Sequence, residues 1–276
     1  MIRLGHIEYS NCFPVHALLV GDAQPAGVEI VSGTPSQLNE ALEARAIDVA
    51  PCSSIEYARH ADTYRILPGF VIASDGPVGS ILFESQVPIE QLGGATIAVP
   101  TASATSVVLL KILLRLKYGV DARYEWFEQS TAADPLAANI AACLWIGDVA
   151  LRRSIPSERH VYDLGAEWTD WTKLPFAFAV WQTTLPSERD DDLEPLLASF
   201  TASRARFRAQ PTQLAEYYAA ILGLQPQRLA RYWKTLRYEL DPAMQEGLLH
   251  FYRLAHELGE APRVERIAWA SQKARA

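Results

Sequence analysis

The stretch ATIAVPTASATSVVLLKILLRLK, residues 95–117, contains the pattern that decides the fold. Its first part, residues 95–99, is a short β-rich run that stops at Pro100. The part beyond the hydroxyls is strongly apolar as far as Lys117, so we predict a buried helix that begins among them. A strand that runs directly into a helix is typical of α/β proteins. The hydroxyl side chains between the two are Thr101, Ser103, Thr105 and Ser106.

The same alternation continues over about two-thirds of the chain, so the fold class that we predict is α/β. A helix is expected at residues 35–45, behind the capping residues Thr34 and Gln37, and another after the S-x-x-E pattern of Ser53 and Glu56. Beyond the last expected strand, the sequence predicts four helical stretches and no further strand. The expected strands are residues 2–7, 28–31, 47–50, 65–74, 80–84, 95–99, 124–127, 143–146, 161–164 and 176–182.

The order of these elements predicts two α/β lobes and a C-terminal helical layer. We expect the chain to cross between the lobes near residues 87–94 and again near residues 182–184. Lobe 1 would then be discontinuous, with residues 1–90 and 183–276, and lobe 2 would be the inserted segment 91–182. A cleft between two lobes is the first place to expect a small-molecule site.

The composition excludes several classes of function. The 276 residues include 25 Lys and Arg against 32 Asp and Glu, a net charge of −7, so we expect no nucleic-acid partner. No apolar run approaches the roughly 20 residues that span a bilayer, so we expect no membrane partner. The N-terminus shows no apolar signal segment, which predicts a cytoplasmic protein.

Motifs for metals, nucleotides and activated nucleophiles are absent from the sequence. Cys12, Cys52 and Cys143 lie at spacings that suit no metal or redox motif, and we expect them to be buried thiols. His250 and His256 lie six residues apart, on different faces of a helix. There is no phosphate-binding loop, dinucleotide fingerprint or nucleophile elbow. We therefore predict no metal site.

Hydroxyl residues gather where predicted strands run into helices. Ser53 and Ser54 follow one strand, residues 101–106 follow another, and Gly147 and Asp148 follow a third. In open α/β sheets, ligands bind at the carboxyl ends of strands, where helix N-termini offer free N–H groups to an anion. The pattern favours a site for a small carboxylate. The alternative is that each Ser or Thr only caps its helix, which contributes about 1 kcal/mol.

Asn11 and Ser80 are two further candidates for this site. Asn11 follows the first strand in YSNCFP, residues 9–14, and its amide can both donate and accept, which suits a hydroxyl or a carboxylate. Ser80 follows GPVG, residues 76–79, and could face the same cleft from the start of a strand. The alternative is that both are plain turn residues.

Seven blocks of the sequence together resemble the chorismate dehydratase family of the futalosine route to menaquinone. They occur in the order of the family and span residues 1–181, whereas the helical C-terminus adds only a compatible length. The blocks are IEYSNCFP (7–14), IDVAPCSSIEY (47–57), GPVGS (76–80), VPTASATS (99–106), IGDVAL (146–151), YDLGAEW (162–168) and LPFAFAVW (174–181).

The resemblance implies a two-lobed, type 2 periplasmic-binding-protein-like fold used as an intracellular enzyme. It implies a hydro-lyase that converts chorismate to 3-[(1-carboxyvinyl)oxy]benzoate without a cofactor. A second copy of the chain, in a homodimer, is a candidate partner besides chorismate. The key Asn of the family falls on Asn11. The implied substrate-binding residues are Ser53, Ser54, Ser80, Thr105, Ser106 and Asp148.

Two positions depart from the family pattern. Arg45 stands where the family has Gly before a strand, and Lys173 stands where it has Gly before Leu-Pro-Phe. Both are interpreted as changes in surface loops, although Lys173 could approach the cleft and alter anion binding.

The resemblance leaves the base of the reaction open, since no His or Lys in these blocks is an obvious one. Dehydration to an aromatic ring is strongly downhill, so the enzyme mainly has to hold the reactive conformer. Our hypothesis is that the enolpyruvyl carboxylate of the substrate takes the ring proton, while Asn11 fixes the ring hydroxyl or a carboxylate. Asp48 and Asp148 are the competing bases.

Two other functions fit a fold of this kind. One is a cytoplasmic carboxylate-binding protein of the solute-binding class, against which the missing signal segment argues. The other is the sister enzyme that makes dihydroxynaphthoate, which has a His near the position of Gly147 and Asp148. The absence of a His at this position favours the dehydratase.

Overall fold

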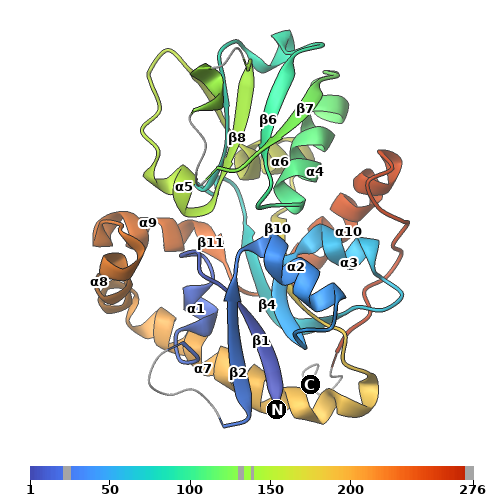
Figure 1. The fold of residues 1–276 in the computed structure, drawn as a ribbon, viewed down its shortest axis with the longest axis vertical. Helices are drawn as coiled ribbons and strands as arrows, with labels where there is room; N and C mark the ends of the chain where they lie inside the picture. The colour runs from blue at the N-terminus through green and yellow to red at the C-terminus, as the bar shows by residue number, and fades with distance from the viewer. Residues whose placement is uncertain (21–25, 130–133, 138–139, 271–276) are drawn as a thin grey trace.

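Two separate β-sheets form the frame of the molecule, one above the other along its longest axis in the computed structural model (Figure 1). The structure describes residues 1–20, 26–129, 134–137 and 140–270. Helices flank both sheets, so the predicted α/β class is confirmed.

The lower sheet in Figure 1 contains six strands: β1 (Ile2–Ile7), β2 (Val28–Gly33), β3 (Val49–Ser53), β4 (Arg65–Ser74), β10 (Phe176–Thr183) and β11 (Leu236–Arg237). Their order across the sheet is β11-β4-β10-β3-β1-β2. β1 is parallel to β2 and β3, whereas β10 is antiparallel to β3 and β4. Every residue of β3 and β10 is buried, which explains their mostly apolar sequences without alternation.

The upper sheet contains five strands: β5 (Ile81–Ser85), β6 (Thr96–Pro100), β7 (Arg123–Phe127), β8 (Ala142–Ile146) and β9 (His160–Asp163). Their order is β7-β6-β8-β5-β9. β6 is parallel to β7 and β8, and β5 is antiparallel to β8 and β9.

The helices before the C-terminal layer are short and mostly follow strands. They are α1 (Phe13–His16), α2 (Pro35–Glu43), α3 (Ser54–Arg59), α4 (Thr105–Ile112), α5 (Gly147–Arg152) and α6 (Leu164–Thr172). α4 continues as a π-helical segment, Leu113–Lys117. Short 3-10 turns lie at Ile89–Gln91, Pro135–Ala137 and Ser187–Leu193.

The C-terminal layer has four helices: α7 (Glu194–Ala209), α8 (Pro211–Leu222), α9 (Pro226–Thr235) and α10 (Pro242–Glu257). α7 packs against α1, and α8 packs against α9. α10 packs against β10 and α3 below and against α4 above, so it contacts both halves of the molecule (Figure 1). The predicted helical layer is confirmed. The prediction of no strand in it is wrong at β11, because two residues are too few to show a pattern.

The chain changes sheet earlier than the sequence predicts. β5 belongs to the upper sheet although it precedes residue 91, and β10 belongs to the lower sheet although it precedes residue 184. The expected crossings at 87–94 and 182–184 followed breaks in composition. The actual crossings follow long-range strand pairing, of β5 with β8 and β9 and of β10 with β3 and β4. We therefore propose an inserted lobe of about residues 75–175, in place of 91–182.

Local capping signals are confirmed in one place and wrong in another. Thr34 caps α2, because its hydroxyl accepts from the N–H of Gln37 and the Gln37 side chain accepts from the N–H of Thr34. The second predicted capping box does not form. Ser53 makes no side-chain cap bond, and Glu56 pairs instead with Arg59 at 2.8 Å. The hydroxyl of Ser53 is therefore not used by its helix.

Arg45 and Lys173 are, within the described ranges, the two residues other than glycine with positive φ, 56° and 63°. A side chain in this left-handed region costs about 1–2 kcal/mol, which Gly avoids. This cost gives a physical reason for the Gly that the resemblance implies at both positions. The ammonium of Lys173 donates to the backbone oxygen of Asp170.

No helix among the residues that the structure describes has the length and apolar character that a membrane span requires. Cys12, Cys52 and Cys143 are buried and unpaired by disulfides, as expected from the sequence.

Gly247 of α10 lies against the second crossing between the sheets, and its substitution tests this packing. A Cβ at this position would lie 2.2 Å from the backbone oxygen of Pro175. In an open helix Gly→Ala is stabilising by about 1 kcal/mol. Here we expect Gly247→Ala to lower the free energy of unfolding by about 1–3 kcal/mol, since α10 must move away from the backbone of Pro175. Urea unfolding measures the change.

Gly93→Ala is the matched control, because a Cβ there meets no atom within 4 Å. We expect this control to change the free energy of unfolding by less than about 0.5 kcal/mol. Equal stability of the two variants would contradict the packing described for α10.

Candidate functional site

Four helix N-termini from both halves of the molecule meet at one small cavity of about 50 Å³. Pro35 at the start of α2 and Ser53, which precedes α3, line it from below. Ser106 in the first turn of α4 and Gly147 at the start of α5 line it from above. A helix N-terminus carries the positive end of the helix dipole, so the place suits negative charge. The N–H groups of Ser53, Ser106 and Gly147 already donate within the fold, to Asn39 Oδ1, Ser103 Oγ and the backbone oxygen of Ser80. The other polar lining residues are Tyr9, Asn11, Ser80 and Ser103.

Asn11 lines this cavity with an atom that has no partner. Its Oδ1 is buried and accepts no hydrogen bond from the described part of the chain. A buried acceptor without a donor costs about 1–3 kcal/mol, so this oxygen is open to a donor on a ligand. Asn11 stands on the loop between β1 and α1, residues 8–12, which we call the Asn11 loop. Its catalytic role remains a prediction.

Three of the serines expected at the substrate do line the cavity: Ser53, Ser80 and Ser106. The hydroxyl of Ser106 accepts from the hydroxyl of Ser103 at 3.0 Å, and the N–H of Ser106 donates to Ser103 Oγ at 3.3 Å. Ser103 therefore caps this turn and also reaches the cavity. It was noted as part of the hydroxyl segment but was not among the expected binding residues.

Ser54 and Thr105, which the resemblance implies bind substrate, do not line the cavity. Their hydroxyl oxygens lie 3.3 Å apart, and Thr105 Oγ1 accepts from the N–H of Ile55 at 3.2 Å. Ser54 donates to the backbone oxygen of Ala177 at 2.8 Å. Since α3 and α4 belong to different halves, these buried hydroxyls join the halves beside the cavity.

The side chain of Asp148 does not line the cavity and is hydrogen-bonded to Ser10. Its two carboxylate oxygens accept from the N–H of Ser10, each at 3.2 Å, and one accepts from the hydroxyl of Ser10. Burial raises the pKa of Asp148, and the hydrogen bonds from Ser10 oppose this rise only in part. Because Ser10 is on the Asn11 loop and Asp148 is on α5, the contact links the two halves directly behind the cavity.

The start of α5 requires glycine. Gly147 has a φ of 59°, and a Cβ there would lie 2.9 Å from the ring of Tyr9. The aromatic ring therefore occupies the space that a side chain at residue 147 would need. A residue with a side chain has no room at position 147 unless this ring moves.

Asp48, the other candidate base, lies at the far end of β3. It forms an ion pair with Arg3 at 2.7 Å and accepts from the N–H of Arg3 at 2.8 Å. Burial raises the pKa of Asp48, but the hydrogen bonds and charge of Arg3 outweigh this and lower it overall. Ser53 at the cavity is about 17 Å away, at roughly 3.3 Å per strand residue. The position of Asp48, far from the cavity, argues against a role as the base.

The C-terminal helix α9 supplies two contacts that the sequence did not indicate. The hydroxyl of Tyr232 lies 2.9 Å from Ser80 Oγ, and the indole N–H of Trp233 donates to the backbone oxygen of Ser10 at 2.7 Å. Both aromatic residues are buried. The sequence around these two residues contains no motif, so it did not predict that they lie near the cavity. Only the folded chain brings α9 there.

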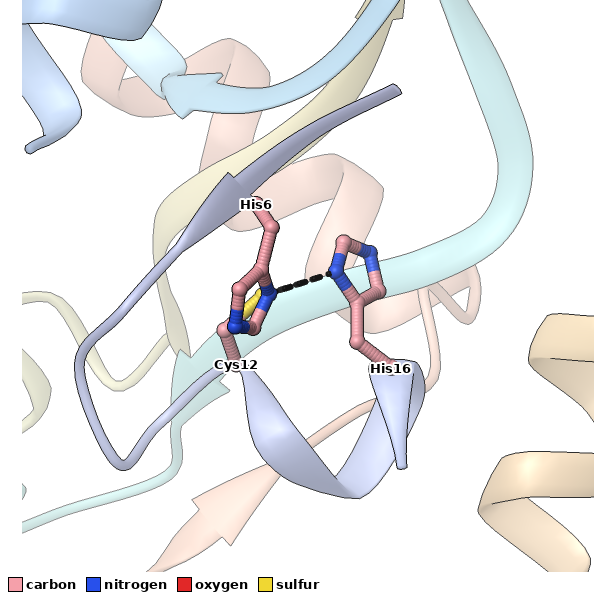
Figure 2. A group of neighbouring side chains, drawn as sticks. All are labelled: His6, Cys12 and His16. Atoms are coloured by element: carbon pink, nitrogen blue, oxygen red, sulfur yellow. Dashed lines mark hydrogen bonds between the residues drawn. The ribbon is translucent and has the colours of Figure 1, made fainter. Parts of the chain in front are cut away.

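His6, Cys12 and His16 form a compact group behind the Asn11 loop. Figure 2 shows the hydrogen bond that joins the two imidazoles. The two Nδ1 atoms lie 3.0 Å apart, and Cys12 Sγ lies 3.5 Å from His16 Nδ1. The possible ligand atoms all lie within 4.8 Å of one another, as in a metal site. The prediction of no metal site did not foresee this group. Its spacing fits no motif, since the residues come from β1, a loop and α1.

The cavity itself contains no formal positive charge, since no Lys or Arg is among the described residues that line it. Lys173, which was expected to be able to reach the cleft, does not. The site offers hydroxyls, an amide and the positive ends of helix dipoles. This set can bind a small anion and an adjacent hydroxyl, and it contains no obvious protein base.

Two halves that enclose a small polar cavity define the class of the protein as a two-lobed, periplasmic-binding-protein-like fold. A solved structure of a protein from Archaeoglobus fulgidus has a TM-score of 0.77 to this chain at 22% identity, covering 94% of this chain and 97% of that one. The periplasmic aliphatic sulphonate binding protein of Escherichia coli has a TM-score of 0.69 at 17% identity, covering 98% and 93%. These likenesses confirm the expected fold.

Within this class, the chain belongs to the menaquinone biosynthesis family, whose model matches residues 2–257. A chorismate dehydratase from Thermus thermophilus is 30% identical over 266 residues, which cover 90% of this chain and 93% of that relative. A chorismate dehydratase from Campylobacter jejuni is 31% identical over 179 residues, which cover 63% of this chain and 64% of that relative.

The buried carboxyl group of Asp148 predicts a pH-dependent stability. Its raised pKa means that the folded chain binds this proton more readily than the unfolded chain. The contribution to stability is therefore full at low pH and is lost as the pH rises through the folded pKa. Asn cannot ionise, so we expect Asp148→Asn to gain stability relative to the unsubstituted protein as the pH rises above about 4, the ordinary pKa of Asp, measured by urea unfolding at a series of pH values.

Asp62→Asn, at an exposed aspartate, is the control for this experiment. We expect its stability difference from the unsubstituted protein to stay constant over the same range. If the stability difference between Asp148→Asn and the unsubstituted protein were equally constant with pH, burial would not raise the pKa of Asp148.

Proposed function

We propose that this protein is a chorismate dehydratase, a lyase that eliminates water from chorismate to give 3-[(1-carboxyvinyl)oxy]benzoate in menaquinone biosynthesis. Family membership and the two relatives named chorismate dehydratase support the reaction. The single structural observation that carries the proposal is the unpaired, buried Oδ1 of Asn11 at a cavity where four helix N-termini meet.

Chorismate presents two carboxylates and one ring hydroxyl, and the site has matching groups on both halves. Ser106 and Gly147, at the starts of α4 and α5, line the cavity from above, and the turn at Ser53 lines it from below. We infer that one carboxylate binds each half, so that substrate binding draws the halves together. This inference explains how the site can hold a dianion without Lys or Arg.

The amide oxygen of Asn11 suits the ring hydroxyl better than a carboxylate. An oxygen can only accept, and the hydroxyl is the donor that chorismate offers. Asn11 would then hold the departing C–O bond in the orientation that elimination needs. Such fixing of a reactive conformer can supply a large part of a rate enhancement.

The proton balance of the proposed reaction needs no oxidant, reductant or cofactor. The enolpyruvyl carboxylate of the substrate takes the ring proton, the C–H electron pair becomes part of the aromatic ring, and the hydroxyl leaves with the C–O pair. The proton and the hydroxide leave as water. Asp148 acts in this proposal as a positioning residue through Ser10, because its oxygens already accept from that residue.

The cavity is too small for the substrate in the closed form. Its volume of about 50 Å³ compares with roughly 300–1,000 Å³ for typical small-molecule sites. Entry of chorismate therefore requires the halves to separate, which breaks the contacts of Ser10 with Asp148 and of Ser54 with Thr105.

A cytoplasmic location and a homodimer remain predictions.

Incubation of the purified protein with chorismate tests the reaction. We expect ultraviolet absorbance and mass spectrometry to show an aromatic product lighter by one water, both before and after treatment with a chelator. Chorismate that binds but is recovered unchanged would indicate a carboxylate-binding protein. Turnover of cyclic dehypoxanthinylfutalosine to dihydroxynaphthoate, with chorismate untouched, would indicate the sister enzyme.

Asn11→Ala separates function from stability at this site. The variant removes an oxygen that has no partner in the fold, so we expect the free energy of unfolding to stay within about 0.5 kcal/mol or to rise. We expect turnover of chorismate to fall on the order of 100-fold or more, because the reactive conformer is no longer held. Steady-state kinetics and urea unfolding of the same sample measure both effects.

Asp148→Asn is the companion variant for the catalytic assignment. We expect it to keep part of the turnover, because its amide oxygen can still accept from the Ser10 N–H. Loss of turnover in Asp148→Asn with chorismate binding intact, together with an active Asn11→Ala, would show that Asp148 is the base.

A further inference from the structure

The His6, Cys12 and His16 group brackets the Asn11 loop. His6 stands near the end of β1, Cys12 directly follows Asn11, and His16 ends α1. Their exposed fractions are 4%, 0% and 0%, and none of them lines the cavity. The contact between the imidazoles in Figure 2 therefore closes the chain segment that carries Asn11 into a ring.

Trp181 of β10 decides where the protons of this group reside. Its indole N–H donates to His16 Nε2 at 2.9 Å, and an indole nitrogen can only donate. His16 Nε2 must therefore carry a lone pair, which places the proton of the neutral ring on Nδ1. That N–H donates to His6 Nδ1 at 3.0 Å, so His6 carries its proton on Nε2. The three residues form a hydrogen-bond chain with one direction.

The charge state of the group agrees with this chain. Burial lowers the pKa of His6 to about 4 and the pKa of His16 well below its usual value, so both rings are neutral at pH 7. Burial also raises the pKa of the Cys12 thiol, whose sulfur accepts from the N–H of Ile7. The ring of Phe200 stacks on His16 at 5.1 Å and helps to exclude water.

The same geometry argues against a metal ion among the three side chains. Binding through both Nδ1 atoms would need lone pairs there, and His16 would have to carry its proton on Nε2. That N–H would face the N–H of Trp181 at 2.9 Å, two donors without an acceptor. A metal would also need a Cys12 thiolate, which burial opposes.

We propose that Trp181 and the histidine pair position the Asn11 loop for the reaction. The hydrogen bonds from Trp181 to His16 and from His16 to His6 tie the segments on both sides of the loop to β10. Phe178 and Ala179 of β10 line the cavity. A displacement of about 1 Å at a reacting group can cost on the order of 100-fold in rate. The catalytic part of this proposal rests on the proposed dehydratase function, whereas the tautomers and the order of the loop do not.

Nuclear magnetic resonance of the unsubstituted protein, labelled with ¹⁵N at histidine, tests the chain without any variant. We expect a protonated Nδ1 and an unprotonated Nε2 for His16, and the opposite tautomer for His6, at pH 7. A His16 ring protonated on Nε2 would overturn the proposal. One equivalent of Zn²⁺ or Cu⁺ taken up at these histidine signals would also overturn it, in favour of a metal site.

Trp181→Phe removes the donor and keeps an aromatic ring. Trp168→Phe is the matched control, because Trp168 is equally buried and donates its indole N–H to the backbone oxygen of Pro175, away from the Asn11 loop. We expect Trp181→Phe to show a mixture of His16 tautomers and lower ¹⁵N order parameters for residues 8–12, towards values below about 0.6. We expect neither change in the control.

The kinetic expectation is a split between kcat and KM. We expect Trp181→Phe to lower kcat for chorismate by about 10- to 100-fold with KM within about twofold, because Asn11 acts on the reacting conformer. Equal kcat in the two tryptophan variants, at matched thermal stability, would overturn the positioning role. If the unsubstituted protein did not turn over chorismate, the proposed function would fail, and the tautomers and order parameters would still decide whether Trp181 holds the loop.

Discussion

The hydrogen bonds between Ser10 and the buried carboxylate of Asp148 are the interaction on which the site depends. They tie the Asn11 loop of the lower half to α5 of the upper half. The same loop is held from a third direction by Trp233, which donates to the backbone oxygen of Ser10. A loop has few regular backbone bonds of its own, so contacts of this kind decide where Asn11 points. Residues of both halves line the cavity, and this loop is held by contacts to α5 and α9.

The charge of the site is a second constraint. The chain carries a net charge of −7, yet dipoles and N–H groups at helix starts act over a few ångströms, and salt screens the bulk field beyond about 10 Å. A small dianion is therefore compatible with this chain, whereas a polyanion is not. Neutral donors also avoid the cost of burying a cation when the site is empty. Asp148 shows the cost of burying a charged group, because its carboxylate lies behind the cavity and burial raises its pKa.

Local signals in the sequence predicted much of the frame correctly. The capping box of Thr34 and Gln37, the strands and the helical C-terminus follow from periodicity and capping, which act over a few residues. Ser53 shows the limit of such signals, since its S-x-x-E pattern is the same whether the hydroxyl caps the helix or faces a cavity. The crossings expected from composition differ from the observed sheet membership of β5 and β10 for a similar reason, because strand pairing over roughly 60 to 130 residues leaves no trace in local composition.

The sequence by itself determined the α/β class, the family and a set of hydroxyls and one amide at strand ends, because residue type and short-range spacing carry this information. Only the tertiary structure decided which of them share a cavity: Asn11, Ser53, Ser80 and Ser106 do, whereas Ser54 and Thr105 bond to each other. It also brought α9 to Ser10 and Ser80, and Trp181 to His16. The direction of a side chain and the position of a proton depend on partners far away in the chain, which come together only when it folds.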